Sequence, residues 1–331
     1  MDSLAAALAG DRYALARLLS AVENGGQEAA AIVEALCPRA GRAHLVGVTG
    51  APGTGKSTLI GQLARHLRAS GQSVAIVAVD PSSPFTGGAL LGDRVRMRDL
   101  TGDPEVFVRS MATRGASGGV ARTTADAALV LDAVGFDVVL IETVGAGQSE
   151  VEVARMTHAT IVVEAPGSGD DVQALKAGLL EIADILVVNK MDLPGGAHKV
   201  RALELATTRP ADDERPEVSG WHVPIIPTVA LTGEGLPELR DALVRHRISM
   251  QQSGSWDRGR RERIRSDLVE TLQRVLMSRL QKMMQEDELE SWVTRIAARE
   301  ASVLAAAEQI VDRWEASGYD RSPSDATTGL Q

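Results

Sequence analysis

One stretch near the start of the chain reads Gly50-Ala51-Pro52-Gly53-Thr54-Gly55-Lys56-Ser57-Thr58. It follows a short apolar run, residues 45–49, and precedes a stretch with helical spacing, residues 59–68. The order is therefore strand, glycine-rich loop and helix, with the G-x-x-x-x-G-K-S spacing of a Walker A motif. Such a loop turns backbone N–H groups toward a phosphate, and the helix N-terminus adds its positive dipole end. The stretch predicts a nucleoside-triphosphate site.

Two side chains of this loop have predicted roles in chemistry. Lys56 is expected to contact the β- and γ-phosphates, and Ser57 is expected to offer its hydroxyl to Mg²⁺. The remaining loop residues from Gly50 to Thr58 are expected to line the nucleotide through their backbone.

The composition is that of an ordinary globular protein. The chain has 331 residues, of which 44% are hydrophobic and 24% charged, and a formal net charge of −9. An acidic chain does not favour a general nucleic-acid surface. The single cysteine, Cys37, excludes an internal disulfide, suits a reducing compartment and is expected to be buried. No stretch approaches the roughly 20 apolar residues of a membrane span, and Asp2 does not fit a signal peptide. These features predict a cytoplasmic protein that does not bind membranes.

Short β-branched runs alternate with helical stretches after residue 44. This alternation is typical of a doubly wound, mostly parallel α/β sheet, in which ligands bind at the carboxyl ends of the strands. The predicted strands are Leu45–Thr49, Val74–Val79, Val138–Ile141, Thr160–Val163, Ile185–Val188 and Ile225–Val229.

The pattern predicts four regions along the chain. Residues 1–40 form an N-terminal helical extension, with helical spacing over 3–20 and 27–36, and residues 41–248 form the P-loop domain. Residues 249–316 form a C-terminal helical arm, and residues 317–331 a disordered tail. The apolar face of the arm either packs back on the sheet or mediates dimerisation, because such a face must be buried. Dimerisation is favoured.

A second motif, Asn189-Lys190-Met191-Asp192, directly follows a predicted strand. An aspartate here can accept hydrogen bonds from N1–H and the exocyclic amine of guanine, whereas adenine offers neither donor at that edge. A site that needs a specific hydrogen-bonding partner discriminates strongly. Ala230 and Leu231, which follow the last predicted strand, are expected to complete the base site. The predicted nucleotide is GTP.

Acidic residues also lie at predicted strand ends. Glu142 is followed three residues later by Gly145, in the place where GTPases carry an acid near Mg²⁺ and a glycine that contacts the γ-phosphate. A purely structural glutamate is the alternative. Asp80 and Asp93 are expected in the outer shell of the metal. Several acids around a triphosphate require a divalent cation, and Mg²⁺ is the expected one.

Taken together, these motifs resemble a known family, the MeaB/ArgK P-loop GTPases. This family lies within the metallochaperone-related group of the signal-recognition-particle-like class. The matching segments are GAPGTGKST at 50–58, VDPSSPFTGGALLGDRVRM at 79–97, FVRSMATRGASGG at 107–119, ETVGAGQSE at 142–150 and NKMD at 189–192. The resemblance implies a chaperone of an adenosylcobalamin-dependent acyl-CoA mutase, such as methylmalonyl-CoA mutase, and the apolar arm leads us to expect a homodimer. The resemblance also implies gating of cofactor loading, release of damaged cofactor and protection of the mutase, with no cobalamin bound by this chain. The adenosyltransferase is a second candidate partner.

The resemblance gives meaning to residues 164–178, which are similar to the mobile loop that signals between nucleotide and mutase in this family. Asp170, Gln173 and Lys176 recur there at three-residue spacing. Lys176 is also a candidate catalytic residue. The alternative is that these side chains form a solvated helix start.

Hydrolysis is expected to be slow in the free protein. Ala146 stands where many small GTPases place a water-orienting glutamine, and the nearest glutamine is Gln148. Three other functions stay open: a GTPase that inserts nickel into an enzyme, a kinase of the ArgK type, and a nucleotide-dependent interaction module that barely hydrolyses GTP.

Overall fold

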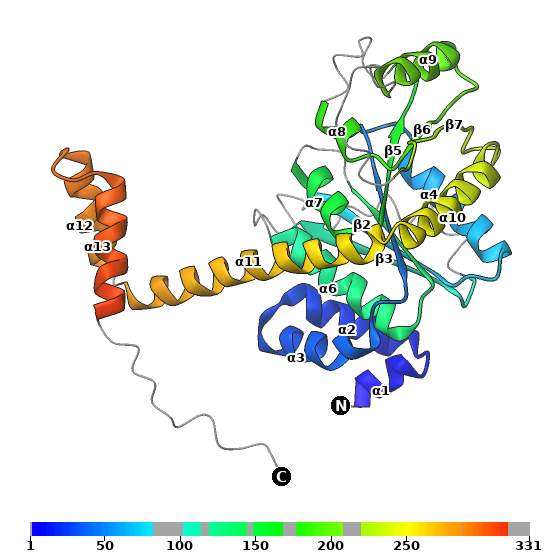
Figure 1. The fold of residues 1–331 in the computed structure, drawn as a ribbon. Coiled ribbons are helices and arrows are strands. Elements are labelled where there is room, and N and C mark those ends of the chain that lie inside the picture. Colours follow the sequence, from blue (N-terminus) through cyan, green and yellow to red (C-terminus); the bar gives the residue numbers. More distant parts are fainter. Residues whose placement is uncertain are drawn as a thin grey trace. The chain divides into compact units, whose positions relative to one another are not determined.

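In the part of the chain that the structure describes, seven strands form one parallel sheet (Figure 1). The computed structural model describes residues 2–81, 102–113, 119–143, 148–167, 177–207, 220–284 and 286–316. The chain divides into two compact units, residues 1–260 and 261–331. The strand order across the sheet is β3-β2-β4-β1-β5-β6-β7. The bounds are β1 (His44–Thr49), β2 (Val74–Pro81), β3 (Val106–Thr113), β4 (Val138–Glu142), β5 (Ala159–Glu164), β6 (Ile185–Val188) and β7 (Ile225–Pro227).

The sheet confirms the predicted fold class. Every strand pair is parallel, and β1 lies at the centre between β4 and β5. The six predicted strands are present. The seventh, β3, has no continuous apolar run because Arg109 and Ser110 interrupt it, and as an edge strand it is only partly covered.

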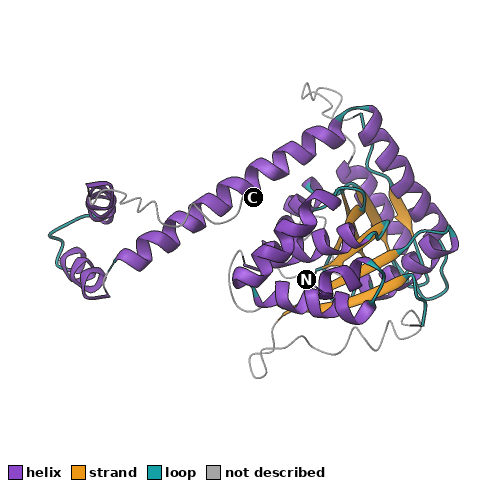
Figure 2. Cartoon of the chain, turned by 90° about the horizontal axis from the view of Figure 1, so that it is seen from below, coloured by secondary structure: helices purple, strands orange, loops and turns teal. Residues whose placement is uncertain are grey.

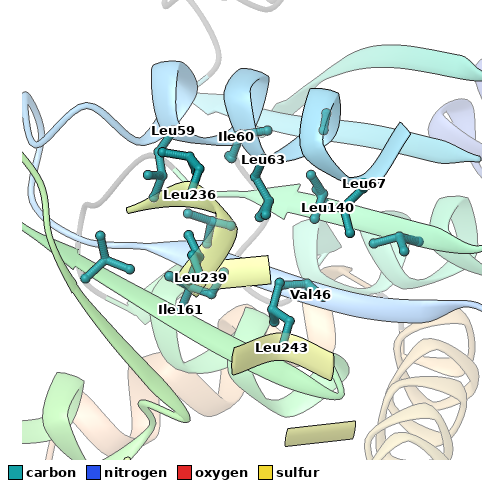
Figure 3. Close-up of a cluster of buried hydrophobic side chains, with 14 of the residues drawn as sticks. Val46, Leu59, Ile60, Leu63, Leu67, Leu140, Ile161, Leu236, Leu239 and Leu243 are labelled. Carbon is teal, nitrogen blue, oxygen red and sulfur yellow. The ribbon is translucent and has the colours of Figure 1, made fainter. Parts of the chain in front are cut away.

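Helices cover both faces of the sheet, as Figure 2 shows. On one face, α4 (Lys56–Ala69) and α10 (Leu236–Gln252) bury a leucine-rich core against Val46 and Val48 of β1 (Figure 3). On the other face, Val139 and Ile141 of β4 pack with the N-terminal helices, α6 (Gly119–Val134) and α7 (Gln148–Met156). Alternate residues of one strand thus face opposite layers, because successive side chains point to opposite sides. Two further helices, α8 (Ala177–Glu181) and α9 (Gly196–Thr207), pack beside β5 and β6.

Three helices form the N-terminal extension: α1 (Asp2–Leu8), α2 (Arg12–Asn24) and α3 (Gly26–Leu36). The helical spacing over residues 3–20 is divided between two helices. The first helix ends at Leu8, Gly10 follows with a φ of +93°, and Asp11 caps the second helix. Its carboxylate accepts hydrogen bonds from the N–H groups of Tyr13 at 2.8 Å and Ala14 at 3.1 Å. A side-chain oxygen at this position satisfies N–H groups that no helical carbonyl can reach.

Helix α2 is fastened to the edge strand β3. The Arg12 guanidinium donates to the carbonyl oxygens of Asp103 at 3.0 Å and of Val106, and it lies 5.7 Å from the centre of the Phe107 ring. Arg109 of β3 forms an ion pair of 2.5 Å with Glu23, and both side chains are largely buried. The N-terminal helices therefore pack on the main domain.

The expectation that Cys37 is buried is wrong. Leu36 is fully buried, and the chain then leaves α3 through the short 3₁₀ turn Cys37–Arg39, which leaves the Cys37 side chain exposed. Pro38 cannot continue the helical hydrogen-bonding pattern, so the direction of the chain changes at this point.

The C-terminal part contains α11 (Ser255–Met283), α12 (Glu286–Ala297) and α13 (Val303–Ala316). Within the second unit, Arg313 of α13 pairs with Glu288 of α12 at 2.5 Å, and Trp292 is buried beside Arg295. A row of apolar side chains on α11 is between 40% and 57% exposed: Ile264, Leu268, Leu272, Val275 and Leu276. None of the described helices is both long enough and apolar enough to cross a membrane.

At the amino-terminal ends of the strands, three rings form a small cluster. His44 begins β1, His158 precedes β5, and Trp256 lies in the first turn of α11 and stacks on His158 with 4.1 Å between ring centres. His44 is 5% exposed, and its ring centre lies 5.9 Å from that of Trp256. Burial, helped by the positive charge of Arg247, lowers the pKa of His44 to about 3.

Replacing His44 with phenylalanine is expected to make stability less sensitive to acid. Because the folded pKa of about 3 lies below the ordinary 6.5, the unfolded chain takes up this proton first as the pH falls. The free energy of unfolding thus keeps its full value above the unfolded pKa and falls below it, with a limiting slope near 1.4 kcal/mol per pH unit, about the cost of one pKa unit. Urea unfolding between neutral and acidic pH measures this slope, which should be shallower for His44→Phe. The exposed His198, changed to Gln, serves as the control and should keep the original slope.

Candidate nucleotide-binding site

The glycine-rich loop connects the end of β1 to the start of α4. Gly50 and Gly55 have φ angles of +139° and +95°. A Cβ on Gly50 would lie 2.1 Å from the carbonyl oxygen of Val163 in β5, and a Cβ on Gly55 would lie 2.4 Å from Nδ2 of Asn189. Both positions therefore require glycine for conformation and for space. The loop is held close against β5 and against the residue that follows β6.

Lys56 is the first residue of α4, and its charge lies within this loop. Its Nζ donates to the carbonyl oxygens of Gly50 at 2.8 Å and Ala51 at 3.1 Å, and the residue is 7% exposed. Thr54 stabilises the same turn, because its hydroxyl donates to Ala51 O at 3.0 Å. A buried ammonium group and a helix N-terminus at one point are the features of an anion site.

Ser57 and Glu142 meet beside that anion site. The Ser57 hydroxyl donates to Oε1 of Glu142, the last residue of β4, over 2.7 Å, and both residues are buried. Mg²⁺ prefers oxygen ligands and is usually held by one or two protein groups together with phosphate oxygens. A hydroxyl and a carboxylate next to a phosphate site fit this ion by their chemistry.

Of the other predicted residues near the phosphates and in the signalling loop, the structure describes only Asp80, through its backbone. Asp80 lies in β2, where its backbone is in register with Ala112 of β3. Asp93, Gly145, Asp170, Gln173 and Lys176 lie outside the described residues.

Asn189, which follows β6, connects three segments of the site. Its Nδ2 donates to Thr54 O at 2.8 Å, and its Oδ1 accepts from the Thr228 hydroxyl at 3.1 Å and from Ala230 N at 3.0 Å. The side chain is 2% exposed. Its amide thus ties the phosphate loop to the chain that follows β7.

A pocket of about 280 Å³ opens next to this amide. It is lined on one side by Gly55 and Thr58 of the phosphate loop, and on the others by Asn189, Lys190, Asp192, Leu193, Val229, Ala230 and Leu231. Lys190 has a φ of +60°, and its Nζ donates to Gly53 O at 2.7 Å. The structure thus brings the N-K-x-D residues, Ala230 and Leu231 together around one cavity.

Two features of the site were not predicted. Thr228 supports Asn189 through its buried hydroxyl, and its place directly after the last strand is the signal that could have revealed it. Glu164, at the end of β5, pairs with Lys199 of α9 at 3.1 Å, with both side chains largely buried. Nothing in the sequence spacing indicates this pair, because it joins segments that only the fold brings together.

A parallel sheet with a lysine-bearing phosphate loop at its centre and an Asn-Lys-x-Asp segment two strands away defines the class of P-loop GTPases. The chain belongs to the family described as methylmalonyl Co-A mutase-associated GTPase MeaB, whose family model matches residues 15–286. It is accordingly a GTPase that binds GTP and GDP.

Individual relatives cover most of the chain. A homologue from Pyrococcus abyssi is 43% identical over 302 residues, which are 91% of this chain and 93% of the homologue. GTPase ArgK of Escherichia coli strain K12 is 38% identical over 250 residues, which are 74% of this chain and 75% of ArgK. The crystal structure of an LAO/AO transport system kinase is similar with a TM-score of 0.71 and 26% identity, over 95% of this chain and 97% of that one.

Two glycines of the loop offer a matched test of the contact with Asn189. Gly55→Ala is expected to weaken GDP binding by about 100-fold or more, because its Cβ would displace the Asn189 amide at 2.4 Å. Gly53→Ala is expected to cost at most about 10-fold, because the φ of +81° is strained for alanine but no atom lies within 4 Å of the added Cβ. Titration with a fluorescent GDP analogue measures both affinities. Equal losses would show that the Asn189 contact is unimportant.

Proposed function

We propose that this GTPase serves an adenosylcobalamin-dependent acyl-CoA mutase, with methylmalonyl-CoA mutase or a close relative as the client. In this role it gates loading of the cofactor, releases damaged cofactor and protects the mutase, without binding cobalamin itself. The observation that carries the proposal is the match of residues 15–286 to a family described as mutase-associated. The described geometry, from Lys56 to the pocket at Asp192, supports the GTP-dependent half of this function.

At the phosphate end, the proposal assigns the developing negative charge to Lys56 and to backbone N–H groups of the loop. Ser57 and Glu142 would hold Mg²⁺, which neutralises phosphate charge when it is bound, and Asp80 and Asp93 would act from its outer shell. Support comes from the 2.7 Å contact between the Ser57 and Glu142 oxygens at the mouth of the loop. Gly145 and Lys176 are proposed as further catalytic residues on sequence grounds, with Asp170 and Gln173 joining Lys176 in signalling to the mutase.

At the base end, Asp192 is proposed to accept two hydrogen bonds from guanine, and Ala230 and Leu231 to complete the pocket. Asp192 lines the pocket and is exposed to it, so its carboxylate is available to a ligand.

Asp192→Asn is expected to lower GTP affinity by about 100-fold or more, because the new amide presents a donor where guanine also presents one. Affinity for xanthosine triphosphate should rise, since xanthine offers an acceptor at that position. Competition binding against a labelled GDP measures both changes. The exposed Asp241, changed to Asn, is the matched control and should leave both affinities unaltered.

We also propose that residues 249–316 form a dimerisation arm attached to the GTPase domain of residues 41–248. The half-exposed apolar row on α11, from Ile264 to Leu276, supports this, because an apolar row of that length favours burial. Sedimentation equilibrium of the full chain tests the proposal, and a monomer at every concentration would contradict it.

The function is tested by GTP turnover of the purified chain with and without a candidate mutase, with ATP as the control nucleotide. Turnover is expected to be slow alone and several-fold faster with the mutase, for GTP only, and Lys56→Ala should abolish the stimulation. Equal use of ATP would favour a kinase, the activity in the name of the similar LAO/AO protein. Unstimulated GTP turnover that responds to nickel would favour a metal-insertion GTPase, and GTP binding without turnover an interaction module.

A further inference from the structure

Two threonines meet at the carboxyl ends of the central strands β1 and β4. Thr49 is the last residue of β1, and Thr143 directly follows β4. The Thr143 hydroxyl donates to the Thr49 hydroxyl over 2.9 Å, and the Thr143 N–H donates to Val48 O over 3.1 Å. The two residues are 0% and 1% exposed, so water cannot replace either bond.

Each threonine adjoins a residue of the phosphate site. Thr49 precedes Gly50, whose carbonyl oxygen accepts from Lys56, and Thr143 follows Glu142, which accepts from Ser57. The hydroxyl pair therefore connects the residue before the phosphate loop to the residue after Glu142. In the sequence, Gly145 lies two residues beyond Thr143. Neither threonine lines the pocket at Asp192.

The chain on the far side of Gly145 also rests on β1. Helix α7 begins at Gln148 and packs so closely on Gly47 that a Cβ there would lie 2.8 Å from Cγ1 of Val153 and 3.1 Å from Oγ1 of Thr157. Glycine at this position lets helix and strand approach. Thus Thr143 before Gly145 and helix α7 after it are both fixed to the strand that carries the phosphate loop.

A polar pair is not needed for packing here. Thr49 is in register with Val162 of β5, and valine has nearly the same shape as threonine, so two valines would fill the same space. Replacing both partners of a buried hydrogen bond with apolar isosteres is often nearly neutral for stability, whereas removing one partner leaves the other unsatisfied. Stability alone therefore does not explain two hydroxyls at this point.

We infer that the Thr49–Thr143 hydrogen bond is a positioning contact for GTP hydrolysis. It sets the position of Glu142 relative to Lys56 and Ser57, and it acts through these groups without touching the nucleotide. The inference rests on the GTPase activity of the chain. Small displacements of groups around a transferring phosphoryl have large effects on rate, because catalysis there depends on position and charge.

The test compares Thr49→Val, Thr143→Val, the double valine variant and Thr143→Ser. Each single valine is expected to lower kcat for GTP by about 10-fold, with KM and GDP affinity within about threefold of the unmodified chain. The double variant should recover the melting temperature lost by the single variants but not kcat, and Thr143→Ser, which keeps the hydroxyl, should retain both. Thr160→Val, which removes the hydroxyl of a residue that is 2% exposed near the start of β5, should leave kcat unchanged.

A kcat that recovers together with the melting temperature in the double variant would overturn the inference, because the pair would then be structural only. Unaltered kcat in both single variants would overturn it as well. If the unmodified chain releases no more phosphate from GTP than Lys56→Ala does, the GTPase activity itself fails, and the inference falls with it. GDP binding by each variant shows separately that the site has folded.

Discussion

The close approach of the phosphate loop to its neighbours is the constraint on which this structure depends. Gly50 passes the backbone of β5 at a distance that admits no side chain, and Gly55 does the same at the Asn189 amide. Because one contact is with strand backbone and the other with a buried amide that is itself hydrogen-bonded, the loop is shaped before any ligand arrives, and its N–H groups need little reorganisation. The Lys56 ammonium, bound to the loop carbonyls, occupies the same small volume. The result is a rigid phosphate loop that holds one buried positive charge, that of Lys56.

The doubly wound sheet delivers the remaining groups to this cradle from separate strands. Glu142 comes from β4, Asn189 from β6 and Ala230 from the chain after β7, and all lie at the carboxyl ends. Helices α4 and α10 fill one face and the N-terminal helices with α6 and α7 fill the other, so the strands have little freedom to shift. The packing of these helices on the two faces of the sheet therefore fixes the positions of the strand ends that carry the site.

Much of this arrangement could be predicted from sequence because it rests on local patterns. The phosphate loop, the Asn189–Asp192 segment and six strands each follow from a run of residues that are adjacent in the chain. Strand β3 escaped prediction because an edge strand needs no continuous apolar run. The break between α1 and α2 escaped because it depends on the turn at Gly10 and the cap at Asp11, and not on the apolar spacing. Thr228 and the Glu164–Lys199 pair depend on segments brought together only by the fold. Cys37 was misjudged because one turn after Leu36 reverses which side chain faces the core.

The attachment of Arg12 to β3 has a consequence for the behaviour of the protein in solution. An open strand edge presents unpaired carbonyl and N–H groups on which another chain can build by β-pairing, a common start of aggregation. The opposite edge, β7, is only three residues long, whereas β3 has eight. Arg12 places a charged side chain over the entry to β3 and occupies carbonyl oxygens there, while Glu23 neutralises Arg109 beside it. The N-terminal helices thus protect the long edge from β-pairing. Their loss would expose carbonyl oxygens at the start of β3 to pairing with another chain, even if the nucleotide site stayed intact.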